Sequence, residues 1–313
     1  MFTYIIKRIL ATIPVMGVVA LFVFLMLRLS PGDPAAVIAG DYATSEDIAR
    51  IREQLGMNEP IVVQFTTWIG SLLSGDLGIS IFTNLPVTTL IAQRLEPTIL
   101  LTLTTIIFSI LVAVPLGALA AWKAGSLIDR AVMVFSVAGF SVPVFVLGYM
   151  LIYQFSIEFK LLPVQGYRSP FEDFVGFVRH IILPTITLSV IFIALIARIT
   201  RASVMEILQE DYIRTARAKG QSEFKVLLRH ALRNAAVPIV TVIGLGVALL
   251  IGGVVVTESV YNIPGLGRLV LDAVLKRDYP IIQGLILLFS FVYIVVNLLI
   301  DLSYTLFDPR IRY

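Results

Sequence analysis

Six long stretches of this sequence contain no charged residue, and each is close to or beyond the length needed to cross a lipid bilayer. Because a helix rises only about 1.5 Å per residue, it needs roughly 20 apolar residues to span the hydrocarbon core. Lipid offers no hydrogen-bond partner to the backbone, so peptide groups must pair within each segment, as they do in a helix. The pattern predicts an all-α integral membrane protein with six transmembrane helices. The stretches cover residues 9–27, 98–122, 131–157, 181–197, 235–257 and 281–300.

The composition supports a membrane protein and excludes several kinds of chemistry. Only 14% of the residues are charged, whereas soluble chains carry about 25%. The absence of cysteine excludes disulfides, thiolate metal sites and a cysteine nucleophile, and the two histidines, His180 and His230, are too few for a multi-histidine metal centre. The sequence also lacks the glycine-rich phosphate loop that ends in Gly-Lys-Ser or Gly-Lys-Thr. We therefore expect no enzyme activity and no cofactor in this chain.

The basic residues indicate which ends of the predicted spans face the cytoplasm. With the N-terminus inside, the cytoplasmic segments contain more than half of the lysines and arginines, although they are much shorter than the outer segments. Cytoplasmic loops carry an excess of such residues, so both termini are placed in the cytoplasm. The first apolar stretch follows Lys7 and Arg8 and resembles a cleaved signal peptide, but it is longer than such a region and no small-residue cleavage site follows it. We prefer an uncleaved first span.

The segment between the first two spans is predicted to form a small helical cap on the outer face of the membrane. One helix is expected over residues 46–55, closed by Gly56, and two more are expected to begin at Pro60 and Pro86, the last of them leading into span two. The cap is too small to be an independent ligand-binding domain. The chain thus divides into an N-terminal transmembrane helix (residues 1–28), an extracytoplasmic helical segment (29–96) and a core of spans two to six (97–313).

The longest connection on the cytoplasmic side covers residues 198–234. The pattern predicts a helix over residues 203–218, a stop at Lys219 and Gly220, and a second helix over residues 222–234 with one apolar face. Such a basic helix pair can lie on anionic lipid, bind nucleic acid or dock a cytoplasmic protein. Its tethering between two spans and its interspersed acidic residues weigh against nucleic acid, and we favour a protein partner. The apolar face contains Phe224, Leu227, Leu228, Ala231 and Leu232.

Residues 210–220, with the sequence Glu-Asp-Tyr-Ile-Arg-Thr-Ala-Arg-Ala-Lys-Gly, resemble the cytoplasmic EAA loop of ABC-importer permeases. The general pattern is Glu-Ala-Ala, three residues, Gly, nine residues and Ile-x-Leu-Pro. Gly220 and Leu232 occupy the glycine and leucine positions, whereas Arg214 and Arg233 replace the glutamate and the proline, as is usual in the peptide/nickel branch of the family. Further motifs of that branch cover nearly the whole chain. They lie at residues 28–34, 75–78, 257–261, 264–267, 277–280 and 308–312.

The resemblance implies a permease subunit with the type I fold and six spans. Such a subunit pairs with a second, homologous permease and forms half of a translocation pathway. Two cytoplasmic ATPase subunits bind ATP and Mg, and an extracytoplasmic binding protein delivers the substrate. The implied location is the inner or plasma membrane of a bacterium or archaeon, and the implied substrate is a peptide, with nickel, glutathione or an oligosaccharide as alternatives. The implied ATPase-coupling residues are Asp211, Arg214, Thr215, Ala216, Arg217, Ala218, Lys219, Gly220 and Leu232.

Four residues in or beside the spans are candidates for the pathway or its gate: Ser141, Pro143, Glu258 and Asn297. Each has an ordinary alternative. Prolines are common in transmembrane helices, Glu258 at a span end can be an interfacial charge like Asp301, and Asn297 can hydrogen-bond to a neighbouring helix. A secondary transporter or channel is the distant alternative function, and the charge-free spans weigh against it because ion coupling usually places ionisable groups inside the membrane.

Overall fold

The computed structural model describes residues 2–29, 35–36, 44–54 and 56–307. Within these ranges the only β-type pairing is one isolated bridge between Ile79 and Pro86, so the predicted all-α class is confirmed. The helices are α1 (Phe2–Leu29), α3 (Ser45–Gln54), α4 (Ile61–Leu73), α5 (Val87–Trp122), α6 (Leu127–Ser141), α7 (Val144–Leu151), η1 (Ile152–Glu158), α8 (Phe174–Leu208), α9 (Asp211–Ala218), α10 (Glu223–Lys225), η2 (Val226–Leu232), α11 (Ala236–Val260), α12 (Leu266–Lys276) and α13 (Tyr279–Phe307). The two η elements are short π-helical stretches.

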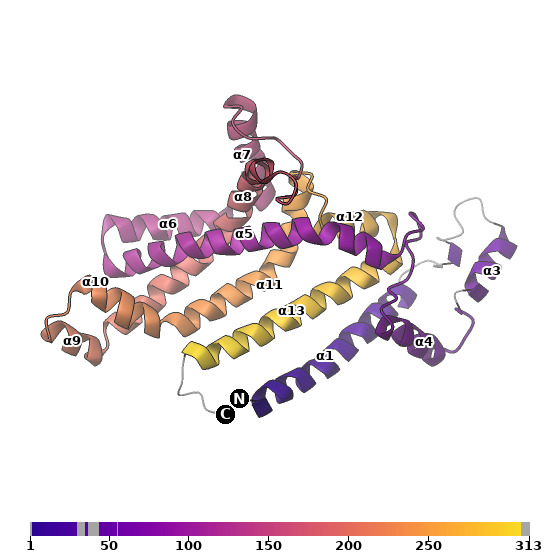
Figure 1. Ribbon diagram of the computed structural model, residues 1–313, viewed down its shortest axis with the longest axis horizontal. Coiled ribbons are helices and arrows are strands. Elements are labelled where there is room, and N and C mark those ends of the chain that lie inside the picture. The colour runs from indigo at the N-terminus through magenta and orange to yellow at the C-terminus, as the bar shows by residue number, and fades with distance from the viewer. Residues whose placement is uncertain (1, 30–34, 37–43, 55, 308–313) are drawn as a thin grey trace.

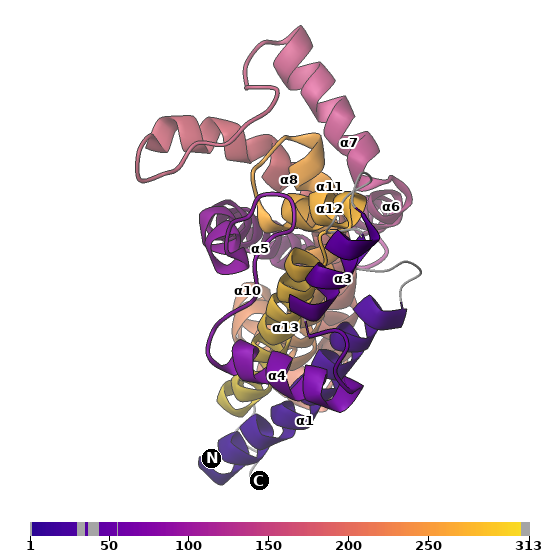
Figure 2. The same cartoon turned by 90° about the vertical axis from the view of Figure 1, so that its right-hand side faces the viewer.

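The long helices run side by side, and each packs on the next in the order α1, α13, α11, α8 and α5, with α6 covering α5 and α8 (Figure 1). The α5–α6 turn, α9 and α10 lie at one end of this layer, whereas α3 and α4 lie at the other. In the view turned by 90°, α7 and the loop before α8 project from the body of the molecule (Figure 2). The motifs at residues 30–34 and 308–312 are outside the described residues.

The number of membrane spans is supported in part. Three described helices are long and apolar enough to cross a bilayer: α5, α8 and residues Tyr279–Leu302 of α13. Two bent pairs of helices raise the number to as many as five if each pair is counted as one span. Residues Leu10–Met26 of α1 form a shorter apolar helix. The six-span arrangement therefore stays a prediction.

The third predicted span is broken at Pro143. Helix α6 ends at Ser141, Val142 has an extended backbone, and α7 begins after Pro143 in a direction bent by 103°. A proline disfavours helical geometry at the residue before it, which explains the extended conformation of Val142. In contrast, Pro115 and Pro184 lie inside continuous helices. Of these three prolines, only Pro143 interrupts its helix.

The prediction of a single helix over residues 203–218 is wrong in one respect, because the structure forms two helices there. Helix α8 ends at Leu208, Glu210 has an extended backbone, and α9 begins at Asp211. The break lets α9 fold back, so that Ile213 packs near Leu208 rather than pointing away from the body. The local sequence favours a helix throughout, and tertiary packing decides where it turns.

The most extensive helix contact lies between α5 and α8. A Cβ atom added at Gly117 would lie 2.5 Å from the carbonyl oxygen of Ala197 and 2.7 Å from Cβ of Thr200. Ala113 of α5 and Ala197 of α8 are small and are buried in the same cluster. Because packing and not hydrophobicity drives helix association in lipid, this glycine contact stabilises the pairing of α5 with α8.

The cap helices predicted near Glu46 and after Pro60 are found as α3 and α4, and the one predicted after Pro86 is the first part of the long helix α5. Helix α4 stacks on α1 through Phe65 and Trp68, whose rings lie 5.1 and 5.6 Å from that of Phe24. These contacts attach α4 to the first long helix.

The loop before α5 is attached to the junction of α12 and α13. Ser80 donates a 2.6 Å hydrogen bond to the buried carboxylate of Asp278, which also accepts one from the backbone N–H of Ile81. The motif at residues 277–280 therefore makes this contact through Asp278, and the motif at residues 75–78 lies directly beside it, with a Cβ at Gly78 3.6 Å from Cβ of Pro280.

Candidate coupling segment and the α11–α12 corner

The predicted partner-docking loop forms a compact structure that we call the coupling segment, which comprises residues 209–234. It connects α8 to α11 and lies at the end of the layer shown on the left of Figure 1. Helix α9 is short, and its buried side consists of Ile213 and Ala216, which pack against Val226 of η2 and the end of α8. Ile213 is 0% exposed. Helix α9 is therefore held firmly while its opposite side stays accessible.

The charged residues of α9 lie on its accessible side. Arg214 forms a 3.3 Å ion pair with Asp211, and both side chains are largely exposed. Arg217 binds Glu223 with two hydrogen bonds of 2.8 and 3.1 Å, and this pair is half-exposed. Exposed pairs contribute about 1 kcal/mol or less to stability. These arginines can therefore exchange their partners for those of another protein at little cost to the fold.

Gly220 ends α9 with left-handed backbone geometry at a φ of 78°. Its N–H donates to the carbonyl of Arg217, and the N–H of Gln221 donates to that of Ala216. This pair of bonds is the Schellman helix ending, which favours glycine because a Cβ is strained there. Nothing lies within 4 Å of a Cβ placed at Gly220, so backbone conformation and not lack of space requires the glycine.

The apolar face predicted for residues 222–234 is split in the structure. Leu227 and Ala231 are buried against α5 and α8, and Leu232 is half-buried in the same cluster. Phe224 and Leu228, however, are 62% and 46% exposed. The predicted face is wider than the surface that α5 and α8 offer, so its edge stays uncovered.

Tyr212 of α9 adds a further exposed aromatic ring to the coupling segment. Partial burial, and then the Glu210 carboxylate, raise the pKa of its phenol. With Phe224 and Leu228, this ring gives the segment an apolar surface beside its charges. Periodicity placed Phe224 and Leu228 on the same apolar face as Leu227, and no sequence signal distinguished the exposed residues from the buried one.

The other candidate site is the α11–α12 corner, formed by Glu258 with Thr98 and the first turn of α12. Glu258 is 0% exposed. Its carboxylate accepts a 2.6 Å hydrogen bond from Thr98 and a 2.9 Å bond from the N–H of Arg268, and it also binds the N–H of Gly267. The hydroxyl of Thr98 accepts in turn from the N–H of Leu266 at 2.8 Å. Glu258 thus satisfies amide groups that a helix leaves unpaired at its N-terminus.

Two glycines make room for this arrangement. A Cβ at Gly265 would overlap the Glu258 carboxylate, and one at Gly267 would lie 2.7 Å from Cα of Val255. The motif at residues 264–267 is therefore required by the approach of α12 to α11. Of the ordinary alternatives for Glu258, a solvated or a paired interfacial charge, the solvated one is wrong, because the carboxylate is buried and bonded to the backbone of α12.

The four predicted pathway residues lie on separate elements. Ser141 and Pro143 are exposed at the α6–α7 bend, where the Ser141 hydroxyl donates to the carbonyl of Val137. Asn297 donates within α13 to the carbonyl of Tyr293, and not to a neighbouring helix. Among the hydrogen bonds found in the described residues, none joins these residues to Glu258 or to each other. The structure does not bring them together in a single site.

A pocket of about 280 Å³ lies next to the α11–α12 corner, between α5, α11, α12 and α13. Thr98, Thr102 and Tyr293 are the only lining residues that carry a polar side-chain group. Such a lining suits apolar groups and offers no site for a charged ligand. The lining residues are Leu95, Thr98, Ile99, Thr102, Leu103, Val247, Leu250, Val254, Leu266, Gly267, Leu288, Phe289, Val292, Tyr293 and Val296.

Sequence comparison finds relatives that match over the full length. Residues 113–313 match the family described as "Binding-protein-dependent transport system inner membrane component", and residues 1–104 match its N-terminal family. A protein of Sinorhizobium fredii named "Probable peptide ABC transporter permease protein y4tP" is 58% identical over 99% of both chains. The "Glutathione transport system permease protein GsiC" of Escherichia coli is 45% identical over all of both chains.

Comparison with solved structures supports the same fold. The chain resembles an inward-facing structure of the MetNI methionine ABC transporter with a TM-score of 0.58 and 16% identity, over 71% of this chain and 97% of the other. A second crystal form of the same transporter gives a TM-score of 0.56, also at 16% identity, over 70% of this chain and 96% of the other. At this identity the likeness concerns the fold alone, and it agrees with the type I permease architecture.

Proposed function

Because this chain belongs to the family of binding-protein-dependent transport system inner membrane components, we propose that it is the membrane-spanning subunit of an ATP-driven importer for peptides. The observation that carries the proposal is the coupling segment. It is firmly packed on its inner side and presents charged and apolar groups on the other. This is what a subunit needs in order to transmit force from a separate ATPase.

The assembly follows from the same proposal. Two cytoplasmic ATPase subunits bind ATP and Mg, and one of them docks on the coupling segment of this chain. With this segment in the cytoplasm and six spans, both chain termini also lie in the cytoplasm of a bacterium or archaeon. A second, homologous permease supplies the other half of the pathway. An extracytoplasmic binding protein approaches the opposite end, where α3, α4 and α12 lie (Figure 1). The apolar pocket beside the α11–α12 corner faces apolar groups of the partner permease or of the substrate.

Peptides are the first substrate class to test, because the relative at 58% identity is named for them. Glutathione is the second candidate, since it is named for the relative at 45% identity and is itself a small peptide. Nickel has no such support: within the part of the chain that the structure describes, no group of three or more acidic or histidine side chains is placed to hold a metal ion. Uptake of labelled dipeptides, tripeptides and glutathione by the reconstituted complex would distinguish the candidates.

Charge reversal on α9 tests the docking role. The double variant Arg214→Glu/Arg217→Glu is expected to lower substrate-stimulated ATP hydrolysis at least about tenfold, because two lost charge-assisted contacts at a partly buried interface cost several kcal/mol together. Hydrolysis is measured on the complex in proteoliposomes, with and without binding protein and substrate. Membrane insertion should be unchanged, since both pairs are exposed.

An exchange of charges separates docking from internal stability. The variant Arg217→Glu/Glu223→Arg restores the ion pair within the chain with its polarity reversed. The proposal expects hydrolysis to stay as low as in the single variant Arg217→Glu, because the partner still meets a negative charge at position 217. Full recovery in this variant would show that the internal pair alone matters, and normal stimulation in the Arg214→Glu/Arg217→Glu variant would contradict docking through α9.

The turn after α9 is expected to depend on its backbone geometry. Gly220→Val should reduce substrate-stimulated hydrolysis several-fold, because the left-handed conformation costs a residue with a Cβ about 1–2 kcal/mol. Gly220→Asn should retain most of the activity, since asparagine tolerates this conformation. The same proteoliposome assay compares the two. Equal activities would mean that the turn does not need to be held in this geometry.

A further inference from the structure

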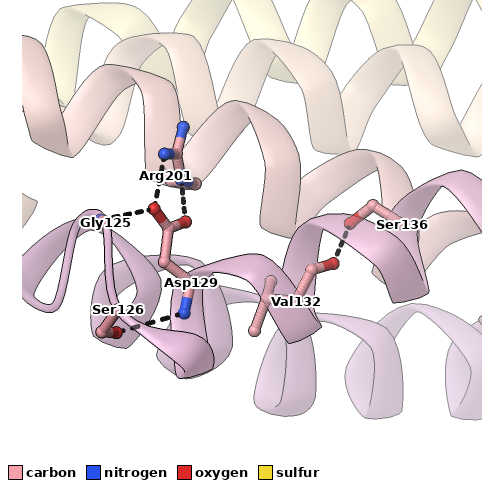
Figure 3. Close-up of polar contacts among 6 residues, drawn as sticks. All are labelled: Gly125, Ser126, Asp129, Val132, Ser136 and Arg201. Atoms are coloured by element: carbon pink, nitrogen blue, oxygen red, sulfur yellow. Dashed lines mark hydrogen bonds and ion pairs between the residues drawn. The ribbon is translucent and has the colours of Figure 1, made fainter.

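An ion pair joins α6 to α8 close to the coupling segment (Figure 3). Asp129 of α6 and Arg201 of α8 are bonded twice: Nη2 of Arg201 donates to Oδ2 of Asp129 at 2.7 Å, and Nε donates to Oδ1. Asp129 is 4% exposed, and the side chain of Arg201 is 23% exposed. A bidentate pair of this kind sets both the distance and the relative orientation of its two helices.

The carboxylate of Asp129 is also fixed from its own side. Its Oδ2 accepts a 2.9 Å hydrogen bond from the N–H of Gly125, in the turn between α5 and α6. The backbone N–H of Asp129 donates to the hydroxyl of Ser126, which caps α6. Figure 3 shows the three contacts converging on this one residue. Asp129 therefore connects the α5–α6 turn, the start of α6 and the last part of α8.

The stretch of α8 that carries Arg201 leads directly into the coupling segment. Val204, one turn further on, is fully buried against Ala118 and Ala121 of α5 and against Leu227 of η2. The final turn of α8 packs on α9. Apolar contacts thus join the coupling segment to α8 and α5. Helix α6 also packs on α8 further from the coupling segment, where a Cβ at Gly139 would lie 3.1 Å from Cβ of Ala194, and the Asp129–Arg201 pair is the polar contact at the start of α6.

We propose that the Asp129–Arg201 pair is the joint through which a displacement of the coupling segment moves α6. This inference rests on the proposed function. Helix α6 ends at the Pro143 bend, where α7 turns away. Without the pair, the coupling segment still moves with α8 and α5, but the start of α6 no longer follows, because only the apolar contacts further along α6 remain. The side chain of Arg201 is 23% exposed, so it can turn to solvent when the Asp129 carboxylate is lost. Loss of the pair is therefore expected to uncouple transport from hydrolysis before it unfolds the protein.

The test measures how many molecules of a labelled peptide are imported per ATP hydrolysed by the complete complex in proteoliposomes, with the probe that the wild type imports fastest among dipeptides, tripeptides and glutathione. Asp129→Asn and Arg201→Lys are expected to lower this ratio roughly tenfold, within the range of measured coupling between sites. Lysine keeps the charge but lacks the planar fork that binds a carboxylate twice. The exchange Asp129→Arg/Arg201→Asp should recover part of the ratio. Arg130→Gln, which removes an exposed charge from the next position of α6, is the matched control and should leave the ratio unchanged.

A purely structural role would give a different result. In that case uptake and hydrolysis would fall together, in proportion to the amount of assembled complex recovered, and the ratio would stay at the wild-type value. That outcome in both single variants would overturn the inference while leaving the proposed function intact. A wild-type complex that shows no ATP-dependent uptake would instead contradict the proposed function, and with it this inference. The Arg201→Lys variant keeps the test decisive if the exchanged pair fails to assemble.

Discussion

Gly117→Leu is expected to destabilise the protein strongly and to lower its thermal midpoint by about 6 °C or more. The added side chain would have to occupy the space of the Ala197 carbonyl and the Thr200 side chain. Backbone atoms cannot rotate away, so α5 and α8 must separate. Overpacking of a close contact costs about 3 kcal/mol or more in such cases, and each kcal/mol shifts the midpoint by about 2–4 °C in chains of this order of size.

The experiment is thermal unfolding of the detergent-solubilised protein, followed by circular dichroism and by recovery of the monodisperse species on gel filtration. The matched control is Gly17→Leu on α1, because a Cβ there meets nothing within 4 Å. It should leave the midpoint unchanged or raise it slightly, since leucine has a higher helix propensity than glycine. Equal midpoints for the two variants would show that α5 and α8 do not approach as closely as the structure places them.

Glu258→Ala is expected to reduce substrate uptake by more than about tenfold. It leaves the N–H groups of Gly267 and Arg268 unpaired at a buried site, and each unpaired buried amide costs about 1–3 kcal/mol. Helix α12 would then be released from α11. The loss of uptake is expected to be larger than the loss of inserted protein. Leu266 and Gly267 of α12 line the pocket, so release of α12 also changes the shape of the pocket.

Two further variants separate the contributions of the corner. Glu258→Gln keeps the shape and one acceptor oxygen, so its uptake should lie between those of the alanine variant and the wild type. Thr98→Val keeps the volume of Thr98 but loses both its donation to Glu258 and its acceptance from Leu266. Uptake per inserted molecule is measured for all three. If alanine is tolerated as well as glutamine, Glu258 does not hold α12 in place.

The two candidate sites lie on the same pair of helices. Helix α5 carries Ala118 and Ala121 under the coupling segment and Thr98 at the α11–α12 corner. Helix α11 carries Ile239 in the first of these contacts and Glu258 in the second. Because both helices run uninterrupted between the two sites, a displacement of the coupling segment would reach the corner without an intermediate loop.

Much of the fold was predictable because lipid imposes its constraint locally. A run of apolar residues must be helical whatever surrounds it, so the apolar stretches predicted the long helices α5, α8, α11 and α13. The Gly220 turn was likewise predictable, since the end of a helix depends mainly on the residues next to it in the sequence. The full-length relatives confirm the permease family inferred from the motifs around Gly220 and Leu232. The roles of the individual coupling residues stay a prediction.

Contacts between distant residues were not predictable from one sequence. Glu258 and Thr98 are 160 positions apart, and Arg201 and Asp129 are 72 apart. Which of these polar groups meet depends on how the helices rotate about their axes and which faces pack together. The break between α8 and α9 and the exposure of Phe224 depend on the same packing. The sequence alone therefore determined which segments become helices in lipid. Only the tertiary structure decided how these helices turn toward one another. The physical reason is that side-chain packing between two helices depends on both segments and cannot be read from either one alone.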